Sequence, residues 1–417
     1  MQCICPPITQ IVRYLSRCIR RTFFNSEILI KGALAGVRRY TYSLVSSLSH
    51  YDIDIHIATT SRPPNDDPLL EKDNVHFHFL PTIVSSRGIY SSKTHFFGEN
   101  RKKFSKNAYD LYLQLNEEYN FDIIHTTELD GYAFALAKKK NALNVPLVMS
   151  AHSPVSTGTW KFNLFVQRPY RKLLKRIIPY CDKIITSSTS LLTKIGKISE
   201  KIKSKIEIIP LSLNCHIYSR IPKIEQIDEF CDKYHIEKNN KTILLLGPFI
   251  PRKSQIEIID YFSVIKKKIP NINFLIIGNG PLLPKIKEKI VEHHLDDTAI
   301  ITGYVSDEEL IIAYHVSDVL LYPAEQGTFG TPIIEAMASG LSVIAADIPP
   351  MNELLSHTEQ LLYPPKDYNA MVESIVKVLS EEQNANKVYE LQRHALENYN
   401  YPVVGKKLLK LYETLIS

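Results

Sequence analysis

The chain has 417 residues, a length that fits two domains of ordinary size better than one. Its hydrophobic content of 44% and charged content of 23% are those of a globular protein, which excludes a mainly disordered chain. The formal net charge of +6 is too small to predict a nucleic-acid-binding protein, but it fits one that handles phosphorylated small molecules or rests near anionic lipid.

The six cysteines are scattered and form no C-x-x-C pair, which indicates neither a zinc site nor a disulfide framework. The sequence also lacks a run of about 18 apolar residues that would predict a transmembrane helix. We therefore expect a cytoplasmic protein.

Residues 1–24 contain four arginines and no acidic residue. On a helical wheel the arginines share one side, and the other side is apolar: Ile11, Val12, Tyr14, Leu15, Cys18, Ile19 and Phe23. A basic helix with an apolar face suits a membrane interface, and it lacks the long apolar centre of a secretory signal. Three interpretations stay open: peripheral contact with the inner face of an anionic membrane, packing of this helix on the body of the protein, or a start codon placed too early.

Residues 25–215 show short β-rich runs that alternate with helical periodicity. This alternation predicts a parallel sheet covered by helices on both faces, as in a Rossmann-like domain. The predicted strands are Glu27–Ile30, Ile53–Thr59, Val75–Leu80, Asp122–Thr126, Pro146–Ala151, Lys183–Thr186 and Ile206–Ile209.

The regular pattern lapses in residues 216–240, which we interpret as a linker that ends in an entry helix. The strand and helix rhythm then restarts, so residues 241–400 are predicted to form a second Rossmann-like domain. Its predicted strands are Thr242–Leu246, Phe274–Gly278, Ala299–Thr302, Val319–Tyr322 and Ser342–Ala345. Residues 401–417 are expected to form a closing helix.

The loop after the Val319–Tyr322 strand leads into a helix through Phe329-Gly330-Thr331-Pro332. Proline suits the first turn of a helix, and Gly340 suits its C-terminal cap. The first N–H groups of a helix have no partner inside it, so the backbone of Gly330 and Thr331 is a candidate anion site.

A second candidate loop follows the Thr242–Leu246 strand and contains Arg252 and Lys253. Ser254 and Glu257 have the spacing of a capping box, which predicts a helix that starts at Gln255. Two cations at a helix N-terminus oppose its dipole, and a diphosphate ligand would explain them, although two solvated cations remain the alternative.

Two further loops follow strands of the same domain. One contains Gly278, where the small residue allows a ligand or another backbone to approach closely. The other contains Val305 and precedes a second capping box, formed by Ser306 and Glu309. All four loops lie after strand C-terminal ends, where open α/β sheets bind their ligands.

Four stretches of the second half resemble glycosyltransferase family 4, the large retaining group with the GT-B fold: "GPFIPRKS", "IIGNGPLLPKI", "ITGYVSDEELIIAYHVSDVLLYP" and "FGTPIIEAMASGLSVIA". In the first half "LAGVRRYTYSLVSSL", "FDIIHTT", "VPLVMSAH" and "CDKIITSS" resemble it more thinly. The resemblance implies two Rossmann-like domains whose parallel sheets face each other across a cleft, and a closing helix that returns from the second domain to the first.

The resemblance also implies a function, the transfer of a sugar from a nucleoside-diphosphate sugar to a saccharide or lipid-linked acceptor. Lys253 matches the lysine that grips the donor diphosphate, and Glu335 matches the glutamate that holds the nucleotide ribose. Gly36 falls at the glycine turn that faces the donor phosphates. His152 matches a histidine near the reacting sugar, with a core or loop histidine as the alternative.

Three departures from the family pattern concern the sugar end of the site. Pro248 stands where the family usually has arginine, and Arg252 is our candidate to replace that charge. Gly327 stands where the family has its first glutamate, and Glu325, two residues earlier, is the candidate substitute. The usual Asn-Gly-Val-Asp reads Leu211-Ser-Leu-Asn214.

No metal site is predicted, and no cofactor beyond the donor substrate. Asp52-Ile-Asp54 resembles a metal-binding D-x-D sequence, but it begins an alternating strand, and we interpret it as structural. Two rivals to the transferase hypothesis remain: a degenerate homologue that binds a nucleotide sugar without turnover, and another GT-B enzyme such as a sugar phosphorylase or a nucleotide-sugar epimerase.

Overall fold

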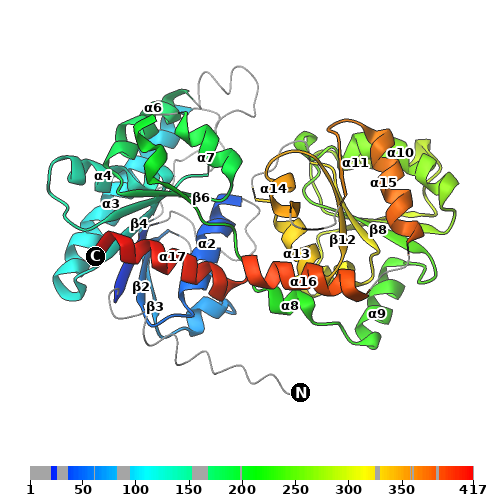
Figure 1. The fold of residues 1–417 in the computed structure, drawn as a ribbon, viewed down its shortest axis with the longest axis horizontal. Helices are drawn as coiled ribbons and strands as arrows, with labels where there is room; N and C mark the ends of the chain where they lie inside the picture. The colour runs from blue at the N-terminus through cyan, green and yellow to red at the C-terminus, as the bar shows by residue number, and fades with distance from the viewer. Residues whose placement is uncertain are drawn as a thin grey trace. The chain divides into compact units, whose positions relative to one another are not determined.

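The fold was analysed in a computed structural model of the chain. It describes residues 20–25, 36–60, 62–81, 94–152, 168–197, 200–324, 329–356, 358, 361–381 and 385–416. The chain divides into two compact units (Figure 1). Unit 1 contains residues 1–212 and 401–417, and unit 2 contains residues 213–400.

Unit 1 is built on a seven-stranded sheet in which every neighbouring pair of strands is parallel. The strand order is β3-β2-β1-β4-β5-β6-β7, which is the doubly wound arrangement predicted from the sequence. The strands are β1 (Arg21–Asn25), β2 (Asp54–Thr59), β3 (Val75–Phe79), β4 (Ile123–Thr127), β5 (Leu147–Ser150), β6 (Lys183–Thr186) and β7 (Ile206–Ile208).

The first strand corrects the prediction for the N-terminal segment. Arg21 begins β1, which pairs with both β2 and β4 at the centre of the sheet, and Phe23 and Phe24 are buried in the core. The predicted basic helix therefore cannot extend to residue 24, and unit 1 begins its folded body earlier than residue 25. The rest of that predicted helix and the predicted strand Glu27–Ile30 lie outside the described residues.

The helices of unit 1 pack apolar side chains against both faces of this sheet. They are α2 (Gly36–Leu48), α3 (Thr94–Tyr119), α4 (Tyr132–Lys139), α6 (Arg168–Ile177), α7 (Thr189–Gly196) and α17 (Tyr401–Ile416). In α2 apolar side chains recur at the spacing of one helix face, at Tyr40, Leu44, Val45 and Leu48, although the whole helix from residue 40 to residue 48 is buried.

The closing helix α17 belongs to unit 1 and packs along α2, as the resemblance implied (Figure 1). Gly405 allows this close approach, because a Cβ atom there would lie 2.4 Å from the carbonyl oxygen of Ser47. Further along α17, the Tyr412 hydroxyl lies 2.5 Å from Nδ1 of His125 on β4. The C-terminal residues thus complete the core of the unit that begins the chain.

Unit 2 has a six-stranded parallel sheet in the order β10-β9-β8-β11-β12-β13. Its strands are β8 (Lys241–Leu246), β9 (Ile272–Ile277), β10 (Ala299–Gly303), β11 (Val319–Tyr322), β12 (Ser342–Ala346) and β13 (Leu361–Tyr363). The predicted strands fall on the first five, and the short β13 was not predicted. The helices include α10 (Gln255–Lys268), α11 (Leu283–Glu292), α12 (Asp307–His315), α13 (Thr331–Ser339), α14 (Met351–Leu355), α15 (Tyr368–Ser380) and α16 (Ala385–Tyr399).

The segment predicted as a linker is helical and belongs to unit 2. It contains α9 (Ile224–Tyr234), which fits the expected entry helix, and all but the first residue of α8 (Cys215–Ser219), which packs on α13 and α16. The chain enters unit 2 at Leu213, whose N–H donates to the Tyr399 carbonyl, beside the point where it leaves. Of the helices that the structure describes, none combines the length and the apolar character needed to cross a membrane.

Candidate functional site

The sheet of unit 2 places two predicted loops next to each other. β8 and β11 are hydrogen-bonded neighbours, and the chain runs outward from them in opposite directions across the sheet. This reversal of strand order is where open α/β sheets bind ligands, outside the carboxyl ends of their strands. The loop after β8 carries Arg252 and Lys253, and the loop after β11 leads to Gly330 and Thr331.

Lys253 is held at this position by a residue of the neighbouring strand. It ends a 3₁₀ turn, Pro251–Lys253, and its Nζ donates to the Tyr322 hydroxyl at 2.6 Å. The same Nζ lies 4.6 Å from the centroid of the Tyr322 ring. Tyr322 is the last residue of β11 and is buried, so it fixes the ammonium group beside the loop that enters α13. Arg252 precedes it with an exposed side chain.

The helix after Lys253 begins at Gln255 as predicted, but the predicted capping box does not form. Ser254 has a left-handed backbone with φ of 54°, and its side chain makes no capping hydrogen bond. A left-handed residue points its side chain away from the first-turn N–H groups that it would otherwise cap. The second capping box is confirmed: Ser306 Oγ accepts the Glu309 N–H at 3.1 Å, and the Ser306 N–H donates to Glu309.

The N-terminus of α13 has the geometry that the sequence predicted. Gly330 is the N-cap with φ of 62°, Pro332 lies in the first turn, and Gly340 closes the helix in the left-handed conformation. A Cβ atom on Gly330 would lie 2.3 Å from Cδ1 of Leu354, the end of a side chain that can shift, so it is the left-handed backbone that favours glycine here. Because Ile333 and Ile334 donate to the Gly330 carbonyl, the helical bonds start after the Gly330 and Thr331 amides.

Phe329 and Thr331 on either side of Gly330 are buried. They hold the entrance of α13 in a fixed, largely apolar setting, in which an anion at the helix N-terminus would be only weakly screened. Glu325, the candidate substitute for the missing first glutamate, lies outside the described residues.

Glu335 is buried within α13, with 1% of its surface exposed. Its Oε2 accepts the Tyr314 hydroxyl at 2.8 Å, and its Oε1 accepts the Tyr218 hydroxyl at 3.0 Å. These two hydroxyls fix the orientation of the carboxylate. The tyrosines come from α12 and α8, which both precede α13 in the chain and both contact it.

Gly278 and Val305 were also predicted to face the donor. Gly278 has φ of 148°, and a Cβ atom there would lie 2.0 Å from the Gly247 carbonyl oxygen. Of the two predicted reasons for its small size, the structure therefore supports the close approach of another backbone. Val305 lies half-buried after β10, the edge strand of the sheet, and no contact assigns it a role.

In unit 1, His152 follows β5 and is fully buried. Its ring centroid lies 3.9 Å from that of Tyr40 on α2, and its backbone N–H donates to Oε1 of Glu128 at 2.8 Å. Burial, together with the nearby His125, lowers the pKa of His152 to about 3. Its imidazole is therefore neutral near physiological pH and is suited to hydrogen bonding rather than to carrying a proton. Gly36, the predicted glycine turn, begins α2.

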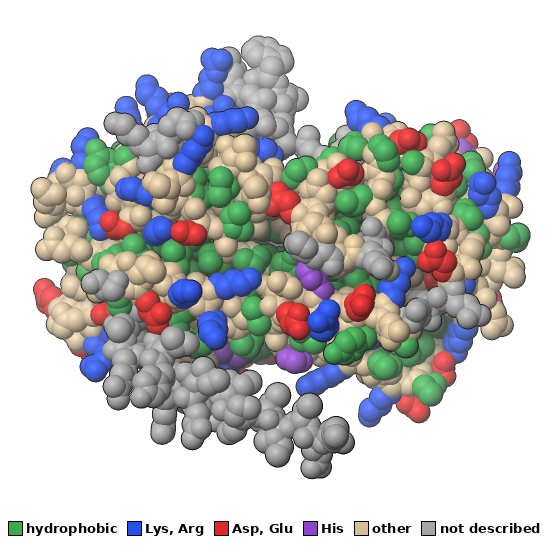
Figure 2. Space-filling view, viewed as in Figure 1, with side chains coloured by type: hydrophobic (Ala, Val, Ile, Leu, Met, Phe, Trp, Pro, Cys, Tyr) green, Lys and Arg blue, Asp and Glu red, His purple; other side chains and the backbone are tan. Residues whose placement is uncertain are grey.

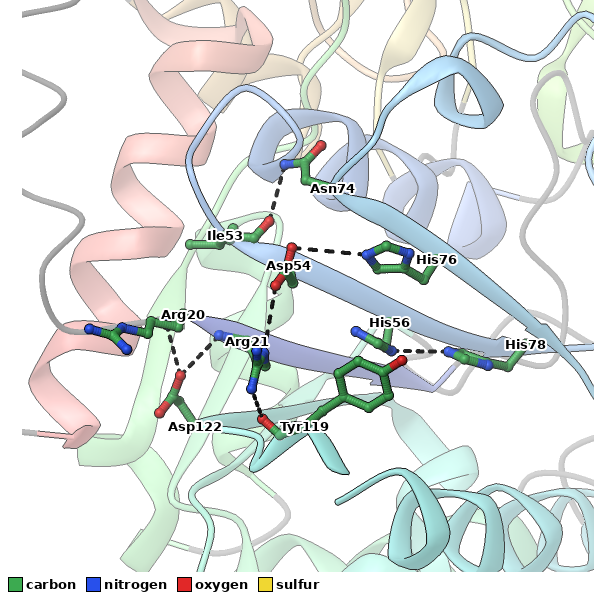
Figure 3. Close-up of polar contacts among 10 residues, drawn as sticks. All are labelled: Arg20, Arg21, Ile53, Asp54, His56, Asn74, His76, His78, Tyr119 and Asp122. Carbon is green, nitrogen blue, oxygen red and sulfur yellow. Dashed lines mark hydrogen bonds and ion pairs between the residues drawn. The ribbon is translucent and has the colours of Figure 1, made fainter. Parts of the chain in front are cut away.

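In the Asp52-Ile-Asp54 sequence, Asp54 makes polar contacts within the sheet of unit 1 (Figure 3). Asp54 begins β2 and lies 3.6 Å from Nε of Arg21 and 3.9 Å from Nε2 of His76. The backbone N–H groups of Arg20 and Arg21 donate to Asp122, at the start of the neighbouring β4. Among the described residues, no group of three or more His, Cys, Asp or Glu side chains is arranged to hold a metal ion.

Sequence reasoning missed the residues that hold the predicted ones in place. These supporting residues are all distant in sequence from their partners. They are Tyr322, which holds Lys253, Tyr218 and Tyr314, which hold Glu335, and Glu128, which holds His152. For Tyr322 and Glu128 one signal was available, because each lies at or directly after the C-terminal end of a buried strand.

Comparison with known proteins gives two family matches that together span most of the chain. Residues 226–395 match the model "Glycosyl transferases group 1". Residues 34–216 match the model "Glycosyltransferase Family 4".

Curated relatives include the alpha-monoglucosyldiacylglycerol synthase of Streptococcus pneumoniae, which is 24% identical over 76% of this chain and 72% of its own length. The processive diacylglycerol alpha-glucosyltransferase of Acholeplasma laidlawii is 25% identical over 71% of this chain and 86% of its length. Among solved structures, Anabaena Alr3699/HepE in complex with UDP has a TM-score of 0.72 at 15% identity, over 95% of this chain and 100% of that one. The structural likeness shows a shared GT-B fold.

Proposed function

We propose a specific reaction for this chain, which belongs to glycosyltransferase family 4 and is therefore a glycosyltransferase. It transfers a sugar from a nucleoside-diphosphate sugar to a lipid-linked or saccharide acceptor, with retention of the anomeric configuration, in the assembly of surface glycans. The observation that carries the proposal is the Lys253 ammonium group, held by Tyr322 beside the N-terminus of α13 at the strand reversal of unit 2. Nothing in the comparisons favours a non-catalytic homologue.

The donor diphosphate binds at the Gly330 and Thr331 amides, with Lys253 as the fixed cation and the exposed Arg252 as a mobile one. Negative charge develops on the departing diphosphate as its bond to the anomeric carbon breaks. A pre-organised ammonium group and a helix N-terminus stabilise this charge more in the transition state than in the ground state. These groups perform the task that a metal ion performs in other transferases, so the reaction proceeds without one.

Glu335 binds the ribose hydroxyls of the donor, and Tyr218 and Tyr314 hold its carboxylate in place. The acceptor hydroxyl attacks the anomeric carbon from the face that the diphosphate leaves, and its proton passes to the diphosphate oxygen. Unit 1 supplies the acceptor side through His152, whose neutral imidazole hydrogen-bonds a sugar hydroxyl.

The acceptor class is a lipid held at a membrane. Two relatives named above act, by their names, on diacylglycerol lipids. In this chain α6 contains no acidic residue and has five exposed cationic residues: Arg168, Arg171, Lys172, Lys175 and Arg176. Leu174 and Ile177 of the same helix are buried. Lysine and arginine side chains gather on the surface over α6 (Figure 2). Such a face is attracted to anionic headgroups at the inner leaflet.

The donor half of the proposal is tested by a panel of nucleotide sugars in a thermal-shift assay. A donor at about 100 times its Kd adds about 2.7 kcal/mol to the stability of the folded chain, and the others add little. Lys253→Ala and Glu335→Ala should then lose most of the transfer activity while they stay folded. The matched controls are Lys267→Ala and Glu288→Ala, exposed residues of the same unit. A panel without any shift, or wild-type turnover in both site variants, would contradict the proposal.

The membrane half is tested by co-sedimentation with phosphatidylglycerol vesicles. Replacement of Arg171 and Lys175 by glutamate should weaken binding at least about tenfold, since each cation near an anionic surface contributes about 1 kcal/mol. The control replaces the exposed Lys267 and Lys268 of unit 2, with the same change in net charge. Equal binding of the two double variants would refute a role for α6.

A further inference from the structure

Glu128 has an unusual backbone for its residue type. It directly follows β4 and has φ of 49°, in the left-handed region that disfavours residues with a Cβ atom. Its side chain is also buried. Strained backbone persists only where the surrounding structure fixes it, and such residues concentrate at functional sites. Burial of a carboxylate likewise requires partners for its oxygens.

Those partners come from two other segments of unit 1. Oε1 of Glu128 accepts the backbone N–H of His152 at 2.8 Å, and Oε2 accepts the hydroxyl of Tyr170. His152 lies two residues after the end of β5, and Tyr170 belongs to α6, the basic helix. One carboxylate therefore joins the ends of two neighbouring strands to the helix that carries the cationic face.

The turn that presents Glu128 is itself fixed. The chain continues as a 3₁₀ helix, Glu128–Gly131, in which the buried Asp130 accepts from Nη1 of Arg101 at 2.6 Å. Gly131 packs so closely that a Cβ atom would lie 2.4 Å from Oγ1 of Thr126. The carboxylate is therefore held in place before any ligand binds.

The location within the sheet points to the acceptor side. β1 and β4 are neighbours from which the strand order runs in opposite directions, so the end of β4 lies at the strand reversal of unit 1. β5 pairs with β4, which brings the end that carries His152 next to Glu128. Ligands of doubly wound sheets bind at this position.

We propose that Glu128 is a positioning residue for His152. It acts through the main chain of His152, because its hydrogen bond goes to the backbone N–H and not to the ring. The same carboxylate holds Tyr170, so it also keeps α6 in register with the end of β5. This inference rests on the proposed function only in assigning His152 to the acceptor side.

The test compares Glu128→Ala, Glu128→Gln, His152→Ala and the double variant Glu128→Ala/His152→Ala, with the exposed Glu117→Ala as control. Glu128→Ala should lower kcat about 10- to 100-fold, with the Kd for the nucleotide sugar within twofold of wild type, because the donor binds unit 2. Glu128→Gln keeps an oxygen that accepts the same N–H and should retain activity within about fivefold. The double variant should be no less active than His152→Ala, since a residue that acts through His152 adds nothing once His152 is gone.

A second readout needs no turnover. Amide hydrogen exchange of the peptide that contains His152 should rise in Glu128→Ala and stay at the wild-type level in Glu128→Gln. A wild-type chain that transfers no sugar but shows this pattern would overturn the proposed function and leave the positioning role standing.

Three results would overturn the positioning role itself. They are wild-type kcat in Glu128→Ala, additive losses in the double variant, and equal losses in the alanine and glutamine variants. The last would show that Glu128 acts through its charge. If Glu128→Ala does not fold, Glu128→Gln and its exchange pattern decide.

Discussion

His125 makes the stability of unit 1 depend on pH. It lies on β4 with 1% of its surface exposed and stacks on Phe24, with ring centroids 4.7 Å apart. Nδ1 lies 2.5 Å from the Tyr412 hydroxyl and Nε2 lies 2.7 Å from Ser150 Oγ, so the ring joins α17 to two strands. Burial lowers the pKa of His125 to about 3.

The sign of the effect follows from proton binding. The unfolded chain takes up a proton at this residue near pH 6.5, whereas the folded chain does not until about pH 3. The contribution of His125 to the free energy of unfolding is therefore fully present above pH 6.5, and it is lost as the pH falls from 6.5 toward 3. pH 5 lies about 1.5 pH units below the pKa of the unfolded chain, so at this pH the loss of stability is about 2 kcal/mol for this residue alone. Burial also lowers the pKa values of His56 and His152 to about 3, so their contributions have the same sign.

The measurement is the free energy of opening of β4 and β5, obtained by hydrogen exchange at pH 7.5 and pH 5. Between these pH values the wild-type chain should lose about 2 kcal/mol more than His125→Gln, which cannot take up the proton. The exposed His216→Gln in unit 2 should leave the pH dependence of unit 1 unchanged. If wild type and His125→Gln lose stability in parallel, His125 is not the buried neutral group described here.

Two further predictions concern unit 2. Lys253→Ala should lower kcat about 10²- to 10³-fold, because it removes a charge that stabilises the transition state. Tyr322→Phe keeps the ring and removes only the hydroxyl, so it should lower kcat about tenfold. Steady-state kinetics with the donor found in the panel distinguish these two losses. Equal losses in both variants would contradict a supporting role for Tyr322. Gly278→Ala should destabilise unit 2 by about 3 kcal/mol or more in urea unfolding, because strain and the clash with Gly247 add. Gly303 also has a positive φ, but a Cβ atom there would meet open space, so Gly303→Ala should lower the free energy of unfolding by only about 1 kcal/mol. Equal losses of stability in the two variants would contradict the packing argument.

The strand rhythm of both units was predictable because parallel strands are buried on both faces and appear as short apolar runs. The strand β1 was not predictable, because Arg20 and Arg21 stand at its N-terminal end and their charges favoured a basic helix. Their partners come from distant parts of the sequence: Asp54 forms an ion pair with Arg21, and Asp122 accepts the backbone N–H groups of Arg20 and Arg21. Charge balance across a sheet is not visible in a local pattern. The edge strand β13 was missed for another reason, because three residues are too few to show a strand pattern.

The candidate site was predictable where local geometry decides it. Gly330, Pro332 and Gly340 define a helix with its N-terminus at a strand end, and they did so from sequence spacing alone. The supporting hydroxyls of Tyr218 and Tyr322 were not predictable, because their partners lie 117 and 69 residues away. Contacts at such separation depend on the order of strands in the sheet, which periodicity does not determine.

The two sheets place their polar residues by one topological rule. In each unit the first and fourth strands in chain order are neighbours at the strand reversal: β1 and β4 in unit 1, and β8 and β11 in unit 2. In unit 2 the loop after the first strand carries Lys253, and the loop after the fourth leads to the N-terminus of α13. In unit 1 the turn after the fourth strand carries Glu128, which makes it the topological counterpart of the α13 loop.

This correspondence separates the chemistry of the two units. The strand reversal of unit 2 presents a cation and helix amides, which suit an anionic diphosphate. In unit 1 the ends of β4 and β5 present a buried carboxylate and a neutral imidazole, which suit hydroxyl groups. A donor bound to unit 2 and an acceptor alcohol bound to unit 1 are therefore the assignment that the charges favour. It follows that Glu128→Ala should alter turnover without altering the Kd for the nucleotide sugar.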